Sequence, residues 1–79
     1  MSEELWESSK QRVMAYKRVF TGADGEKILE DLKRSTGFYV SVFDQVPTVH
    51  AFNEGQRTVA ALIHTMVEAP EPPDEETEE

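Results

Sequence analysis

The chain has 79 residues, which leaves room for one domain at most and excludes two large domains. Its 38% hydrophobic and 30% charged residues are typical of a soluble, helix-rich domain, and the lack of cysteine excludes disulfides, thiolate zinc sites and cysteine nucleophiles. The net charge of -8 is concentrated at the end, because residues 68–79 hold seven acids and no base, which leaves nine acids against eight bases in residues 1–67.

The first expected element is an amphipathic helix over residues 3–20. This stretch contains no glycine or proline, and Trp6, Val13 and Phe20 recur at seven-residue spacing on one face. Ser2 is the expected N-cap.

A second, shorter helix is expected over residues 23–36. Thr21 or Asp24 is positioned to cap it, in a spacing that resembles a capping box. Gly37 is well placed to end this helix in a left-handed conformation.

Residues 38–43 read Phe-Tyr-Val-Ser-Val-Phe and have a strong strand preference. No second strand-like segment is present to pair with them, so we expect an extended aromatic crossover over residues 37–45 that covers the helices. The alternative is that the segment adds as a strand to a sheet of another chain.

A third helix is expected over residues 47–67, because Pro47 suits a first turn and Asp44 or Thr48 can cap it. Gly55 in the middle of this helix suggests a close approach by another helix. One face carries residues in alternating three- and four-residue steps, apolar at every position except Gln56, which is coiled-coil-like spacing. This seam consists of Val49, Phe52, Gln56, Val59, Ile63 and Met66.

The last twelve residues, 68–79, combine three prolines with a run of acids and almost no apolar side chains. Such a composition predicts a disordered acidic tail that follows a helical domain of residues 1–67. The tail is a solubilising appendage in one interpretation and a tether for a basic surface in the other. Neither a signal peptide nor a long apolar run is visible, so we expect the chain to be neither secreted nor in a membrane.

Motifs that would carry catalysis are missing from the sequence. His50 and His64 stand fourteen residues apart with no organised carboxylate partner, and Gly22 and Gly25 lack the lysine of a phosphate-binding loop. No serine lies in a nucleophile motif. We therefore expect no enzyme activity, no metal and no cofactor.

Basic residues concentrate on the first helix, at Lys10, Arg12, Lys17 and Arg18. Proteins that bind nucleic acid usually carry a strongly basic domain, whereas residues 1–67 have a net charge near -1. The composition therefore argues against nucleic-acid binding. Salt bridges within or between subunits, or a weak contact with the acidic tail, are the expected roles of these bases.

Seven aromatic residues are more than three short helices can enclose, so we expect some of them to be exposed and then covered by a partner. Trp6 and Tyr39 are the first candidates. The full set of expected protein-interaction residues is Trp6, Tyr16, Tyr39, Phe43, Gly55, Arg57, Val59, Ile63 and Met66.

Three blocks of the sequence occur in a characteristic order: YKRVF at residues 16–20, GEKILEDL at 25–32 and FNEGQRTVAALI at 52–63. Together they resemble a family of small proteins encoded by tailed bacteriophages, whose members are short and carry aromatic "Y-x-R-x-F", "G-x-x-x-L" and "F-x-x-G-x-R" patterns. The resemblance covers about residues 13–66.

This resemblance implies a gene near the head and portal genes, and an accessory role in the virion or in its assembly. It implies a location in the host cytoplasm during infection and in the virion. It also marks Arg57, with Gly55 beside it: the guanidinium would clamp the carboxylate of Asp24, of Asp44 or of a partner chain. A salt bridge that ties the third helix to a loop is the structural alternative.

The sequence thus predicts a small all-helical, three-helix domain with an aromatic crossover and an acidic tail. The expected function is that of a non-enzymatic phage structural or assembly factor that binds other virion proteins of the portal or capsid region, and itself, in multiple copies. The alternative is a host-directed phage regulator that binds a bacterial protein, with the tail imitating nucleic-acid charge. A small transcriptional regulator is a further alternative.

Overall fold

The computed structural model describes residues 5–73 and contains three helices in this range, with no strand. They are α2 (Ser9–Phe20), α3 (Ala23–Ser35) and α4 (Pro47–Glu68). The predicted all-helical domain with three helices and a crossover is therefore confirmed. The expected cap at Ser2 and most of the expected acidic tail, residues 74–79, lie outside the described residues.

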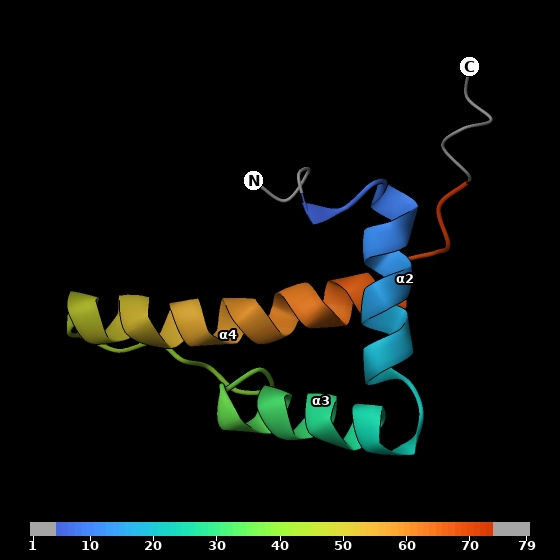
Figure 1. The fold of residues 1–79 in the computed structure, drawn as a ribbon. Coiled ribbons are helices and arrows are strands. Elements are labelled where there is room, and N and C mark those ends of the chain that lie inside the picture. The colour runs from blue at the N-terminus through green and yellow to red at the C-terminus, as the bar shows by residue number, and fades with distance from the viewer. Residues whose placement is uncertain (1–4, 74–79) are drawn as a thin grey trace.

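The three helices meet at one end of the molecule (Figure 1). There α2 crosses the C-terminal part of α4, α3 runs beside the C-terminal half of α4, and each helix contacts the other two. The N-terminal half of α4 extends beyond α3 and is accompanied only by the crossover that leads into it. The principal extents of 51 × 30 × 18 Å reflect this elongated arrangement.

The buried core is small and lies where the helices meet. Among the described apolar side chains, only Leu29 on α3, at 6% exposure, and Ala60 on α4 are buried, and Gly25 on α3 is also buried. The remaining apolar side chains are half-buried or exposed. So small a core leaves much apolar surface in contact with water.

Helix α2 begins at Ser9, later than the expected residue 3. Ser8 is its N-cap: the Ser8 hydroxyl accepts a hydrogen bond from the backbone N–H of Gln11 at 3.0 Å. The Gln11 side chain accepts another from the backbone N–H of Glu7 at 2.7 Å. These two bonds resemble a capping box and stop the helix from extending toward the N-terminus.

The expected caps for the second helix are wrong, because glycines form the turn between α2 and α3. The N-cap is Gly22, at a φ of 94° that side-chain-bearing residues rarely adopt. Thr21 instead ends α2, since its hydroxyl and its backbone N–H both donate to the carbonyl of Lys17. Gly25 then lies directly against the last turn of α2, where a Cβ atom would stand 2.8 Å from the backbone of Phe20.

The expected end of α3 is confirmed in detail. Gly37 has a φ of 77°, and the backbone N–H of Phe38 donates to the carbonyl of Lys33 at 2.9 Å. This six-to-one bond across a left-handed glycine is the Schellman arrangement. It redirects the chain into the crossover.

Side-chain hydrogen bonds hold the crossover in place, since residues 37–45 do not pair with a strand. The Asn53 side chain donates to the carbonyl of Val42 at 3.3 Å, which ties the crossover to α4. The Asp44 carboxylate accepts from the backbone N–H of Val46 at 2.8 Å, two residues on, as in an Asx turn. The expected caps of the third helix, Asp44 and Thr48, are therefore wrong: Val46 is the N-cap and makes no side-chain bond, while Pro47 occupies the first turn as expected.

The C-terminal end of α4 has no basic residue in its own last turn and takes its cation from α2. The Lys17 ammonium donates to the carbonyl of Val67 at 2.7 Å and is half-buried there. A positive charge at a helix C-terminus satisfies a free carbonyl and complements the helix dipole. This bond fastens the crossing of α2 and α4.

Replacing Lys17 with Met should keep the aliphatic packing and lose the bond, which would lower the free energy of unfolding by about 1 kcal/mol. Thermal unfolding followed by circular dichroism measures this change, with Arg18→Met, an exposed neighbour on α2, as the matched control. The deficit should shrink at high salt because the interaction is electrostatic. Equal stability losses for the two variants would contradict the role of the Lys17 bond.

Candidate functional site

The part of the molecule beyond the helix junction has the character of a binding surface. We call it the arm and define it as the crossover residues 40–46 together with the first half of α4, residues 47–58. Its large apolar side chains face solvent: Phe43 is 71% exposed and Phe52 is 65% exposed. The other exposed apolar side chains of the arm are Val40, Val46 and Val49. Exposed large apolar side chains gathered in one part of a molecule are typical of surfaces that bind a partner.

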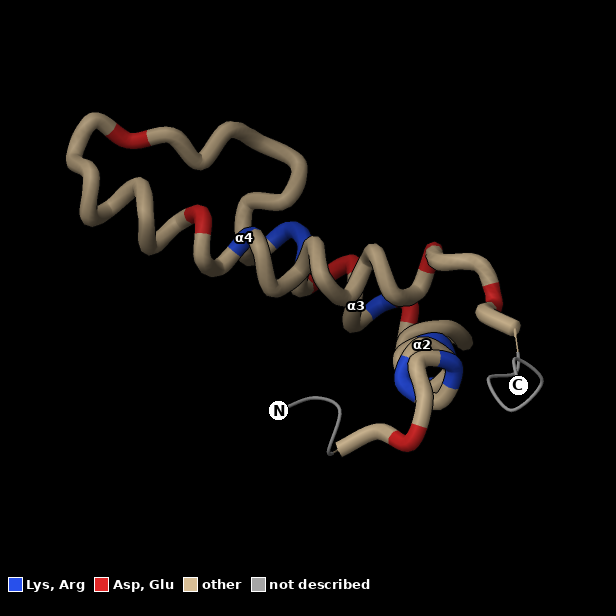
Figure 2. The backbone as a smooth tube through the Cα atoms, turned by 90° about the horizontal axis from the view of Figure 1, so that it is seen from above, with Lys and Arg blue, Asp and Glu red and all other residues tan. Residues whose placement is uncertain are grey.

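The arm also carries very little charge, as Figure 2 shows. Its charged side chains are Asp44, Glu54 and Arg57. The Arg57 guanidinium donates through Nε and Nη2 to one Glu54 oxygen, at 3.2 and 3.1 Å, so this pair neutralises itself. Depletion of charge is the feature that distinguishes the centre of a protein interface from ordinary surface.

The expected partner of Arg57 was Asp24, Asp44 or a partner chain, and the two expected partners within this chain are wrong. Glu54, three residues earlier on the same helix, binds the guanidinium instead. An acid one turn away reaches the base without ordering any other segment, so it wins over acids on distant loops. Arg57 therefore does not tie α4 to a loop within this chain.

Helix α4 is more polar on the face that it turns toward the crossover than on the opposite, outward face. His50 and Asn53 face the crossover, where the His50 ring lies 5.4 Å from the Phe43 ring and Asn53 holds the Val42 carbonyl. Farther along this face, His64 lies 5.3 Å from the Phe38 ring. The apolar seam therefore faces away from the rest of the chain over most of its length.

Gly55 lies on the outward side of the arm and has no role in the internal packing. A Cβ atom built there would meet nothing within 4 Å, and the residue has no positive φ. The expected approach of another helix is thus absent within the described chain. A glycine in a helix interior is destabilising by about 1 kcal/mol relative to alanine, so neither the backbone nor the core of this chain accounts for it.

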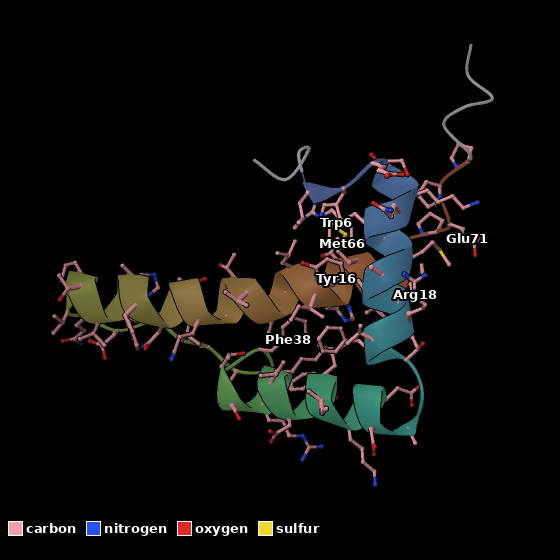
Figure 3. All side chains as sticks on the ribbon, viewed as in Figure 1. Trp6, Tyr16, Arg18, Phe38, Met66 and Glu71 are labelled. Carbon is pink, nitrogen blue, oxygen red and sulfur yellow. The ribbon has the colours of Figure 1, made fainter. Side chains whose placement is uncertain are left out.

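The expected interaction residues fall into separate groups. Trp6 and Tyr16 line one shallow apolar depression at the start of the chain, beside the crossing of α2 and α4 (Figure 3). Met66 lies in the same region, where it and Ile63 are half-buried. A second group lies away from this crossing: Phe43, Gly55 and Arg57 are on the arm, and Val59 follows directly after it on α4.

Tyr39 belongs to neither group, although it is exposed as expected. Its hydroxyl donates to Glu30 at 2.8 Å, and the Arg34 Nε donates to the other Glu30 oxygen at 3.0 Å. The hydrogen bond from Tyr39, followed by the contact with Arg34, lowers the pKa of Glu30, and the same bond to Glu30 raises the pKa of Tyr39. This trio fastens the start of the crossover to α3.

The hydrogen bond between Tyr39 and Glu30 should therefore weaken at both low and high pH. The stability that the ionised Glu30 contributes is fully present above its ordinary carboxyl pKa of 4.5 and is lost as the pH falls through its lowered pKa. The stability that the protonated Tyr39 hydroxyl contributes is fully present below its ordinary pKa of 10.0 and is lost as the pH rises through its raised pKa. Ultraviolet titration of tyrosinate in a Tyr16→Phe background isolates Tyr39. We expect ionisation above pH 10.0, shifted back toward 10.0 by Glu30→Ala; no shift would contradict the contact.

Sequence reasoning missed part of the arm. Val40 and Val46 are exposed apolar residues that it did not single out. The signal was present in the charge pattern, because Asp44 is the only charged residue between Arg34 and Glu54. A long uncharged stretch that includes a surface loop is itself a sign of a covered surface.

No group of three or more His, Cys, Asp or Glu side chains within residues 5–73 is placed to hold a metal ion. In the same part of the chain, no helix has the length and apolar character needed to cross a membrane.

The family described as Bbp19-like phage protein matches residues 16–76, which is most of the chain and includes α3, α4 and the crossover. No curated protein and no solved structure matches.

Proposed function

The chain belongs to the Bbp19-like phage protein family, and from this premise we propose that it is a non-enzymatic structural or assembly factor of the phage virion. In this proposal it binds other virion proteins, of the portal or capsid region, through its arm. It acts in multiple copies, in the host cytoplasm during assembly and in the particle.

The observation that carries this proposal is the exposed, nearly uncharged apolar surface of the arm. Phe43, Val46 and Phe52 all face solvent there, although a chain with so small a core would gain from burying them. Large aromatic side chains that protrude from a rigid element are typical anchors of protein interfaces. A partner that covers the arm would supply the apolar burial that the chain lacks on its own.

The charge distribution favours a protein partner over a nucleic acid. The basic residues of α2 lie at the helix junction, away from the arm (Figure 2). Among them, Lys17 binds the end of α4, and the Arg12 guanidinium lies 5.9 Å from the Tyr16 ring. Bases engaged in this way do not form the open basic surface that phosphate binding requires.

Mass spectrometry of gradient-purified phage particles and of empty precursors tests the proposal. We expect the chain at a fixed copy number relative to the portal and capsid proteins in at least one of these fractions. Presence in precursors alone would identify an assembly factor. Absence from both would contradict the proposal and favour a host-directed regulator, for which a pull-down from infected cells is the corresponding experiment.

A further inference from the structure

We propose that the outward face of α4 is a homodimer surface, on which α4 of a second copy packs antiparallel about a two-fold axis near Gly55. We call this face the outer stripe and define it as Phe52, Gly55, Val59 and Leu62. The inference rests on the proposed function for its biological setting and names one partner of the arm. It leaves the crossover, with Phe43, free for other virion proteins.

The outer stripe is a continuous apolar line on the helix surface. Its members follow one another in steps of three, four and three residues, which keeps them on one side of an α-helix. Phe52, Val59 and Leu62 are exposed large apolar residues, and Val59 keeps 59% of its surface in water. On the opposite side Asn53, Arg57 and Ala60 are half-buried or buried, so the stripe has no partner within the described chain.

Gly55 at the centre of the stripe is an independent sign of a close helix contact. Since neither its φ nor any intrachain neighbour requires glycine, an external approach is the remaining physical reason for the missing Cβ atom. Glycine on one helix lets the backbone of a second helix approach more closely than other residues allow. An approaching helix would therefore cross α4 at this point.

The stripe is complementary to itself in the antiparallel direction. When two copies of a helix pack antiparallel about a two-fold axis, the numbers of the residues that face each other add up to the same value. An axis between residues 55 and 56 therefore places Phe52 of one copy opposite Val59 of the other, and Val49 opposite Leu62. Phe52 then faces the smaller Val59, Leu62 faces the smaller Val49 beside the stripe, and Gly55 faces Gln56 of the second copy at the crossing. This matching is the reason for choosing a second copy as the occupant.

Charge and area also fit a second copy. The stripe holds no charged residue, and the nearest charges, Glu54 and Arg57, are paired with each other, so two identical faces meet without repulsion. Phe52, Val49, Val59 and Leu62 are 65%, 41%, 59% and 40% exposed, which amounts to roughly 350 Å² per copy and roughly 700 Å² for two copies, so the contact is of the small kind that weak, reversible complexes use. We expect a reversible dimer with a dissociation constant in the micromolar range.

Sedimentation equilibrium of the pure full-length chain, from about 1 to 200 µM, tests the dimer. We expect wild type to shift from monomer to dimer, and Val59→Glu to raise the dissociation constant at least about tenfold because it buries a charge. Ile28→Glu is the matched control, since Ile28 is 53% exposed on α3, outside the stripe. A monomeric wild type, or equal effects of the two variants, would overturn the proposal.

Disulfide trapping tests the antiparallel direction. The sequence contains no cysteine, so only the introduced thiols can form a disulfide. A mixture of the single variants Phe52→Cys and Val59→Cys should form the mixed disulfide. Neither variant alone should form a disulfide-linked dimer. The two identical cysteines would be offset by seven residues, about 10 Å along the helix axis, which is too far for a disulfide. Self-linked dimers without the mixed species would overturn the antiparallel arrangement.

The two proposals fail in different ways. A dimer in solution, with no chain found in particles or precursors, would leave the dimer standing and refute the virion role. A monomer at every concentration, with Val59→Glu selectively lost from particles, would leave the virion role standing. In that case the outer stripe would bind another virion protein and the homodimer would be refuted.

Discussion

Substituting Gly25 with alanine should destabilise the protein by about 2–3 kcal/mol, a large share of the stability of so small a domain. The added Cβ atom would stand 2.8 Å from the Cα and carbonyl carbon of Phe20, and closer still to the carbonyl oxygen of Val19. These are backbone atoms, so no side-chain rotation relieves the clash. The last turn of α2 and the first turn of α3 would have to separate.

The matched control for this prediction is Gly55→Ala, the same substitution in a different setting. Nothing lies within 4 Å of the added atom there, so alanine should raise the stability of the folded monomer by about 0.5–1 kcal/mol through better helix propensity. Thermal unfolding at low protein concentration compares the two. The melting temperature should fall by more than about 10 °C for Gly25→Ala and rise slightly for Gly55→Ala. Changes of the same sign would contradict the described packing.

Shortening Leu29 to alanine should have a comparable effect, about 2–4 kcal/mol. Leu29 is 6% exposed and is the one large apolar side chain that the described chain buries between its helices. Its neighbour Ile28 is more than half exposed, so Ile28→Ala should cost less than about 1 kcal/mol and serves as the control. Urea unfolding measures both, and equal losses would show that the core lies elsewhere.

The helices could be predicted from sequence because their signals are local. Periodic apolar residues, the glycines at positions 22 and 37 and Pro47 mark the elements, and Gly37 ends α3 in the expected conformation. The residue at which the first helix begins was harder to predict. Ser2 and Ser8 are both good caps, and the choice of Ser8 depends on the bonds that Gln11 completes.

The candidate site could be predicted only in part, because sequence periodicity does not say what covers a stripe. The seam on α4 exists as expected, yet Val49, Phe52 and Val59 face water while Ile63 and Met66 are half-buried near α2. The difference arises because α2 and α3 cover only the C-terminal half of α4. That depends on the directions of the turns between the helices, which no single segment determines.

Ion pairs were the least predictable feature. Arg57 had several acids within plausible reach, and the partner turned out to be Glu54, one turn away on its own helix. Lys17, one of the bases expected to form salt bridges or to contact the acidic tail, instead donates to a backbone carbonyl at the end of α4. Long side chains adapt to whichever oxygen the packing brings near, so their partners follow from the tertiary structure.

The central claim is that the arm is the surface by which this chain joins the virion. Its most direct test is the ratio of this chain to capsid protein in purified particles when the phage carries Phe43→Ser. The control is Val19→Ser on α2, because Val19 is 64% exposed, close to the 71% of Phe43. Both variants should fold, as circular dichroism would verify. We expect the ratio to fall at least about tenfold for Phe43→Ser and to stay near the wild-type value for Val19→Ser. An unchanged ratio for Phe43→Ser would contradict the claim.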